Sequence, residues 1–254
     1  MNPNTRRTLI KNYKHIFGAC TLSFANCETV ADWLEESGLN PMIVPNGMNL
    51  PNSNRIISKP PSMLSTRGCP TIGYVGNMSD RIDWELMLEL IDSRPDWIFL
   101  MIGNFPRVQS ELFKLVRDRS NVLMPGVVPA SQMASWYSAM HVGLIPHLDS
   151  ELSRAMNPLK LYVYRAHGLR VVSTPIQNIG DFGDDVIIAD GARDTMNALE
   201  KAIEEAVTCG PDWPDASILD QLSWNARINH MMKHIRATYH DRQGSCIKPQ
   251  LSAA

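Results

Sequence analysis

The sequence lacks features that would place it in several familiar functional classes. No uninterrupted apolar run approaches the 18 residues of a membrane-spanning helix, and the N-terminus lacks an apolar segment of signal-peptide length. No GxGxxG pattern follows a predicted strand, so the fingerprint of a dinucleotide-binding oxidoreductase is absent. We therefore expect a soluble, cytoplasmic protein, with peripheral attachment at the inner face of a membrane left open.

Cysteine pairs and basic clusters are also missing. The five cysteines never occur in CxxC spacing, which favours reduced structural thiols over a zinc site. His230 and His234 are four residues apart, but no third ligand accompanies them, so we interpret them as a surface pair and expect no metal and no cofactor. The net charge of −2, without a cluster of lysine and arginine, excludes a typical nucleic-acid interface.

What the sequence does contain is a regular alternation of apolar runs and amphipathic segments. The 254 residues are 44% hydrophobic and 20% charged, which is typical of a globular chain. Short continuous apolar runs predict strands at 71–75, 97–102, 122–124, 142–145, 171–173 and 186–189. Helical patterns fall between or after them, at 83–92, 108–116, 131–140, 158–167 and 192–207. This order predicts an α/β fold, a Rossmann-like parallel sheet with helices on both faces.

Residues 157–175, NPLKLYVYRAHGLRVVSTP, form the central unit of this pattern. Pro158 suits the first turn of a helix, where its missing N–H costs nothing. An apolar stripe follows and stops at Gly168, a typical C-terminal helix residue, before the strand at 171–173. The stripe consists of Leu159, Leu161, Tyr162 and Ala166.

Two further segments flank the predicted sheet. Before it, we expect a strand at 19–24, a helix at 27–37 capped by Asn26, and a strand at 41–44 that ends at Pro45-Asn46-Gly47. Residues 50–68 are rich in Pro, Ser and Asn without periodicity, which indicates a linker. After the sheet, Ser223-Trp224 opens a last helix that reaches about Tyr239.

These fragments, in this order and spacing, resemble the retaining glycosyltransferases of the GT-B fold, of the group 1 type that builds teichuronic acid and exopolysaccharide. The resemblance runs from about Ala19 to Tyr239. It is carried by PNG, YVGN, WIFLMIG, PGVVP, GLIP, NPLKLY, GLRVVSTP and the SW dipeptide.

The resemblance implies a domain organisation. Residues 69–208 correspond to the C-terminal, nucleotide-sugar donor-binding domain, and residues 1–49 to a remnant of the N-terminal acceptor domain. Between them lies the linker 50–68, and after them come C-terminal return helices (209–240) and a disordered tail (241–254). About 150 residues of a complete enzyme are missing at the front. A fragment, a truncated gene and one subunit of a split enzyme are the three explanations that we consider.

The resemblance also assigns candidate site residues. Gly76-Asn77 follows the first predicted strand of the sheet, where backbone N–H groups can approach a donor diphosphate; a simple tight turn is the alternative. Arg154 and Lys160 flank the start of the central helix and would neutralise the diphosphate, unless they are solvated surface charges. Arg81 is a weaker third cation.

The remaining site candidates concern the nucleotide and the sugar. Val128, after its neighbour Val127, lies where the family holds the base through the backbone. Many relatives carry two glutamates eight residues apart, the second of which binds the ribose, but this chain has Ala155 and Val163 there. Losing that acceptor would cost about 1.5–3 kcal/mol of binding free energy. Glu151 in the preceding loop is a candidate sugar contact, as is Asp149.

Arg165 and His167 are a further departure, because they place polar groups where the family's helix usually carries small or apolar residues. No catalytic residue is assigned, since transfer with retention in this family relies on positioned phosphate neutralisation rather than on a protein nucleophile.

We expect the donor-binding half of a glycosyltransferase that moves a sugar from a UDP- or GDP-linked donor to a carbohydrate or lipid-linked acceptor. By itself this chain should be inactive. The alternative is a non-catalytic or degenerate nucleotide-sugar-binding module, or a subunit that pairs with a separate acceptor-domain chain or with itself. A sugar-nucleotide epimerase of the same architecture is a third, less favoured interpretation.

Overall fold

A computed structural model describes residues 12–246, apart from 14, 50–58, 66–67, 107–108, 180–181 and 183–184. The strands are β1 Ser23–Ala25, β2 Pro41–Ile43, β3 Thr71–Val75, β4 Ile98–Ile102, β5 Val122–Gly126, β6 Val142–Ile145, β7 Arg170–Ser173 and β8 Val186–Ile188. The helices are α2 Glu28–Glu36, α3 Ser62–Ser65, α4 Trp84–Ser93, α5 Glu111–Arg117, α6 Met133–Tyr137 after a 3-10 turn at Ala130–Gln132, α7 Glu151–Arg154, α8 Leu159–Ala166, α9 Gly191–Cys209, α10 Ala216–Gln221 and α11 Trp224–Cys246. None of these helices is both long and apolar enough to cross a bilayer.

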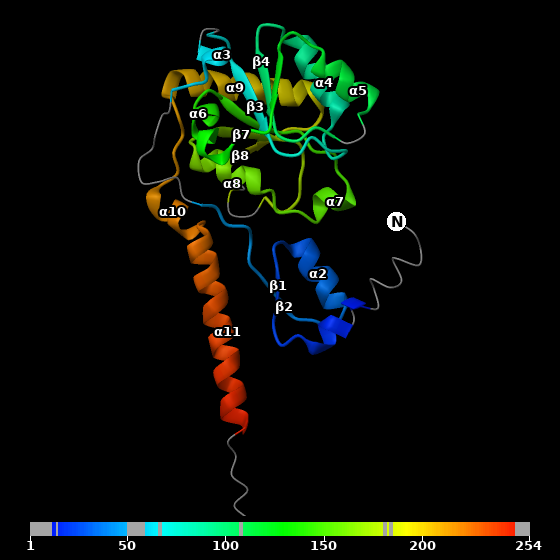
Figure 1. The fold of residues 1–254 in the computed structure, drawn as a ribbon, viewed down its shortest axis with the longest axis vertical. Helices are drawn as coiled ribbons and strands as arrows, with labels where there is room; N and C mark the ends of the chain where they lie inside the picture. The colour runs from blue at the N-terminus through cyan, green and yellow to red at the C-terminus, as the bar shows by residue number, and fades with distance from the viewer. Residues whose placement is uncertain are drawn as a thin grey trace, which may run out of the picture.

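Six strands form one parallel sheet in the order β5-β4-β3-β6-β7-β8 (Figure 1). The predicted α/β fold with six parallel strands is therefore confirmed. The chain builds outward from β3 to β5, then crosses back so that β6 pairs with the other edge of β3. Strand order thus reverses between β3 and β6, which is where ligands of open parallel sheets bind.

Helices cover both faces of this sheet and enclose two apolar cores. On one face α4, α5 and α9 pack over side chains such as Phe99 and Leu144. On the other face α6 and α8 pack over Ile98, Leu100 and Val171. A local signal starts α4, where Asp83 caps the helix by accepting from the backbone N–H of Leu86 at 2.9 Å.

A small unit precedes the sheet and consists of the parallel pair β1–β2 with α2. Its first strand begins later than expected, because residues 15–19 are helical and Phe17 from this segment stacks edge-on against Trp33 at 5.8 Å. The predicted cap is wrong by one residue: Cys27, not Asn26, precedes α2, and no side chain caps it.

The C-terminal segment departs from the sequence-based boundary. Residues 241–246 continue α11 instead of starting a disordered tail, and residues 247–254 lie outside the described part. Arg242 and Gln243 favour helix, and the first proline after Trp224 is Pro249. Figure 1 shows α11, orange to red, extending away from the large sheet. Its first residue is tied to the segment after β2, because Trp224 N–H donates to the carbonyl of Met48 at 3.0 Å.

Candidate functional site

The carboxyl ends of β3 and β6 meet at the reversal point of the sheet and define the candidate site. Gly76 and Asn77 follow β3, and His147 follows β6 one residue after Pro146. The N-terminal turn of α8 lies over the same place, since Lys160 approaches Gly76. Three segments that are remote in the sequence therefore converge on one turn.

The turn at Gly76 is tightly constrained by its neighbours. Gly76 has φ +149° and its N–H donates to the carbonyl of Ile102 at 2.9 Å. A Cβ on Gly103, which follows the neighbouring strand β4, would lie 1.9 Å from the carbonyl oxygen of Gly76. Only glycine fits at position 103. Without a side chain there, the ends of β3 and β4 approach closely and their backbone is left uncovered. Beside it, a hollow of about 690 Å³ is lined in part by Asn77 and Asn104.

Asn77 offers hydrogen-bonding groups at this surface. Its carbonyl accepts from the Tyr74 hydroxyl at 2.9 Å, and its side-chain oxygen accepts from Asn104 Nδ2 at 3.0 Å. Its backbone N–H donates to no other described residue. An N–H that is held in place and unused is suited to an anion such as a phosphate oxygen.

Lys160 projects from the first turn of α8 into the Gly76 turn. Its Nζ lies 3.3 Å from Tyr74 Oη and 3.0 Å from His147 Nε2, and 4.5 Å from the centre of the Tyr74 ring. Its Cε would be 3.4 Å from a Cβ on Gly76. The ammonium is thus held beside the backbone that a diphosphate would approach.

Two cations at this site have no carboxylate partner. Within the described part of the chain, no Asp or Glu lies within 4.0 Å of Lys160 or of Arg81. Burial, together with the positive charge of Arg81, lowers the pKa of Lys160 to about 7. Burial and the same two cations lower the pKa of His147 to about 3. Lys160 and Arg81 are thus available to an anionic ligand, while Asp80 lines the neighbouring hollow.

The start of α8 adds a further attraction for anions. No side chain caps this helix at Pro158. Leu161 N–H donates to the carbonyl of Pro158 at 3.0 Å, whereas the N–H groups of Leu159 and Lys160 donate to no other described residue. Its position is held by Asn157, which is 4% exposed. The Asn157 side-chain oxygen accepts from Asn46 N–H at 2.9 Å and its amide donates to the carbonyl of Asn178 at 3.0 Å.

The structure gives the other predicted polar residues different surroundings. Arg154 is exposed, and its Nε and Nη2 donate to the carboxylate of Asp149 at 2.7 and 2.6 Å rather than contacting the Gly76 turn. The expectation that Glu151 lies in a loop is wrong, because Glu151 begins α7, which Ser150 caps by accepting from Ser153 N–H. The roles of Arg154 and Glu151 stay predictions.

The predicted nucleotide residues lie on the apolar side of the site. Val128 and Val163 are both half-buried against the core beneath α6 and α8. Val163 is three positions after Lys160, so the two share a face of α8. By contrast, Val127 is 67% exposed. The Val163 side chain cannot accept a hydrogen bond, and its assignment to the ribose stays a prediction.

Arg165 and His167, the two unexpected polar residues of this segment, serve packing. Arg165 is buried, and its guanidinium pairs with Asp212 at 2.9 Å and Asp185 at 3.4 Å. His167 stacks on Tyr137 with ring centres 4.4 Å apart, and burial lowers the pKa of His167 to about 4. Both lie away from the Gly76 turn, at the other end of α8.

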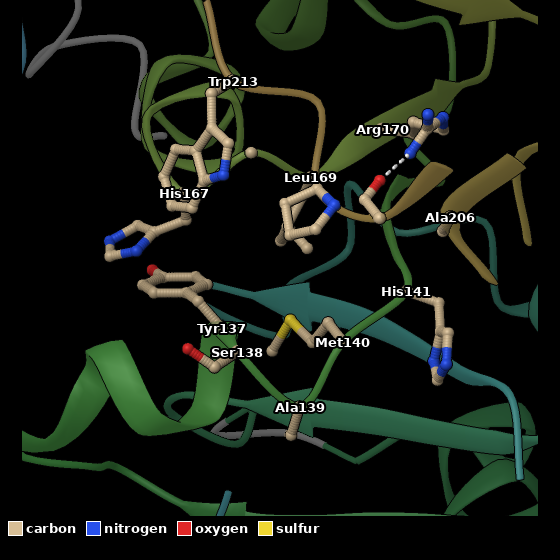
Figure 2. A pocket seen from close by; sticks show the side chains of 13 residues that line it. Tyr137, Ser138, Ala139, Met140, His141, His167, Leu169, Arg170, Ala206 and Trp213 are labelled. Atoms are coloured by element: carbon tan, nitrogen blue, oxygen red, sulfur yellow. Dashed lines mark hydrogen bonds between the residues drawn. The ribbon is translucent and has the colours of Figure 1, made fainter. Parts of the chain in front are cut away.

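Figure 2 shows this other end of α8, where the stacked rings of His167 and Tyr137 and the indole of Trp213 border a hollow of about 200 Å³. The hollow is also lined by His141, which precedes β6, and by Arg170, which begins β7. The hollow therefore lies at the amino edge of the sheet. That edge is opposite the one where parallel sheets bind ligands.

Sequence reasoning did not single out Tyr74 and His147. Tyr74 is hidden inside an apolar strand pattern, and His147 follows the strand of GLIP by two residues. Both occupy the last residues of a strand or the first residues after it. That position was the available signal, because the strands flanking the reversal point supply ligand-binding residues.

Residues 69–208, more than half of the chain, match the family of glycosyl transferases group 1, so the chain belongs to this family. One curated relative is TuaH of Bacillus subtilis (strain 168), which is 23% identical over 177 residues. The match covers 68% of this chain and 45% of TuaH. Its name assigns TuaH provisionally to teichuronic acid biosynthesis as a glycosyltransferase.

Solved structures share the fold at low sequence identity. Sucrose-phosphate synthase from Thermosynechococcus elongatus matches with a TM-score of 0.68 and 16% identity, over 92% of this chain and 62% of that one. HepE of Anabaena, in complex with UDP and glucose, matches with a TM-score of 0.64 and 12% identity, over 86% and 63%. The chain thus spans less than two thirds of the length of these relatives.

Proposed function

We propose that this chain binds the diphosphate of a nucleotide-sugar donor at the Gly76 turn, as the donor-binding half of a glycosyltransferase. The activity would transfer the sugar, with retention, to a carbohydrate or lipid-linked acceptor. Membership of the glycosyl transferases group 1 family supports the reaction class. The UDP seen with HepE supports UDP as the first nucleotide to test.

The observation that carries this proposal is the position of Lys160. Its Nζ lies against Gly76 at the reversal point of the sheet, without a carboxylate partner among the described residues. A diphosphate there would meet the Lys160 ammonium, the free N–H of Asn77 and the open start of α8. As the sugar leaves, negative charge grows on the diphosphate, and these groups would stabilise it without a protein nucleophile.

Calorimetric titration with UDP, GDP and their sugar conjugates tests the proposal. We expect one nucleotide to bind saturably, and Lys160→Ala to weaken its affinity roughly 10- to 150-fold, the value of a hydrogen bond to a charged group. Lys201→Ala is the matched control, since Lys201 is exposed on α9. Failure of the folded wild-type chain to bind any of these nucleotides would overturn the proposal.

The second candidate is a nucleotide-sugar-binding module without transfer activity, alone or as the donor subunit of a split enzyme. Val163 favours it, because the position that binds ribose in many relatives has no acceptor here. Product formation separates the two candidates. Transfer of labelled sugar from the bound donor to a carbohydrate or lipid-linked acceptor would support the enzyme. Transfer that appears only after a separate acceptor-domain chain is added would support the donor subunit of a split enzyme, and donor binding without transfer under either condition would support the non-catalytic module.

A further inference from the structure

We propose that His147 is a positioning residue for Lys160, holding one of its N–H groups so that another is directed at the donor diphosphate. This inference deepens the function proposed above and rests on it for the identity of the anion. His147 is separated from Lys160 by 13 positions and belongs to a different segment, the one after β6.

The first step of the argument is the count of donors on the ammonium. A charged lysine has three N–H groups and no acceptor, so each contact of Nζ must be a donated hydrogen bond. One goes to Tyr74 Oη at 3.3 Å and one to His147 Nε2 at 3.0 Å. One N–H remains, and the Nζ lies 3.6 Å from the position of a Cβ on Gly76, at the proposed diphosphate position.

The second step is that His147 is itself rigidly held. It is 4% exposed. Its backbone N–H donates to Thr174 Oγ1 at 3.0 Å, and its backbone carbonyl accepts from the same hydroxyl at 2.6 Å. Its ring meets the Tyr74 ring edge-on at 6.2 Å. A fixed ring with an unprotonated Nε2 restricts the orientation of the flexible lysine side chain more than a water molecule would.

The third step is the charge around the pair. The Arg81 guanidinium, from the loop before α4, acts on both residues of the pair, and the Tyr74 hydroxyl from β3 contacts Lys160 Nζ. Burial and the positive charges of Lys160 and Arg81 disfavour a proton on His147, so the imidazole stays neutral at neutral pH and Nε2 can accept from a charged Lys160. Tyr74 connects Lys160 to the Gly76-Asn77 turn, since its hydroxyl accepts from Lys160 and donates to the carbonyl of Asn77.

Two substitutions at His147 test this role. His147→Phe keeps a ring but removes the acceptor, whereas His147→Gln places an amide oxygen near the position of Nε2. In His147→Phe we expect the Lys160 side chain to move toward water, which raises its titration midpoint from about 7 toward the ordinary lysine value. We expect UDP affinity to fall about tenfold, and His147→Gln to restore both quantities.

The midpoint is measured by nuclear magnetic resonance on the lysine-labelled chain, with the Lys160 signal assigned through Lys160→Ala. His141→Phe is the control, because His141 accepts from Thr71 N–H at the opposite end of β6 and does not contact Lys160. Circular dichroism and thermal melting establish that each variant is folded.

Three outcomes decide the inference. A folded His147→Phe with an unchanged Lys160 midpoint would overturn it, and so would a His147→Gln that behaves like His147→Phe. A shifted midpoint restored by glutamine would support it. Because the midpoint is read in the free chain, it separates this role from the proposed function: absence of UDP binding by the wild type would remove the function while the midpoint still tests the contact.

Discussion

Asn46 and Asn157 join the small N-terminal unit to the start of α8 by two hydrogen bonds across 111 residues. Asn46 N–H donates to the Asn157 side chain at 2.9 Å, and Asn46 Nδ2 donates to the Asn157 carbonyl at 2.6 Å. This pair fixes the segment after β2 against the helix that carries Lys160. It gives the Pro45-Asn46-Gly47 turn a role in placing the candidate site.

Asn157→Ala should therefore destabilise the chain. It leaves Asn46 N–H and the carbonyl of Asn178 without their partner in a buried place, which costs about 1–3 kcal/mol of unfolding free energy. Urea unfolding followed by circular dichroism measures this. Asn40→Ala, at an exposed position, should change stability by less than about 0.5 kcal/mol. Equal effects of the two substitutions would contradict the structure.

Gly103→Ala tests the close approach of the two strand ends. The new Cβ would lie 1.9 Å from the carbonyl oxygen of Gly76, so the turn must open, and we expect a loss of more than about 3 kcal/mol together with nucleotide binding. Gly126→Ala is the matched control: its φ is +81°, but no atom lies within 4 Å of the new Cβ. Backbone strain alone should cost it about 1–2 kcal/mol. Thermal melting and UDP titration compare the two.

Nucleotide affinity should decrease as the pH rises above 7. The pKa of Lys160 in the free chain is lowered to about 7, and a bound diphosphate favours the charged amine, so the complex takes up a proton. The diphosphate itself is mostly ionised above its second pKa of about 6, so it does not account for the change. Calorimetry in buffers of different ionisation enthalpy measures the uptake. A pH-independent affinity between pH 7 and 9, or one whose pH dependence survives in Lys160→Ala, would contradict this.

Val163→Glu should strengthen nucleotide binding if the ribose lies beside α8. The new carboxylate would share a helix face with Lys160 and accept from the ribose hydroxyls, a gain of roughly 10- to 150-fold in affinity. Val163→Leu controls for the change in side-chain size at this half-buried position. The comparison uses UDP and inorganic diphosphate (pyrophosphate), since only UDP carries the ribose. An equal gain for both ligands would place the ribose elsewhere.

Much of the fold follows from local patterns. The limits of β3 and β6 coincide with prediction, because each depends on a continuous apolar run, whereas α4 begins one residue later than predicted, with Asp83 as its cap. The start of β1 also differs from prediction, since Phe17 and Trp33 pack together and favour helix where the local pattern suggests strand. The helix α7 was missed although Ser150 could signal its start, because four residues are too few to show a period.

The sequence by itself determined the parallel α/β architecture, the family and the candidate lysine, because periodicity and motif order are written along the chain. Only the tertiary structure decided the partners of each charge: Lys160 meets His147 and Tyr74, whereas Arg154 meets Asp149. Those contacts depend on which strand ends lie side by side. In a parallel sheet that is set by the crossover from β5 back to β6, which no local pattern records.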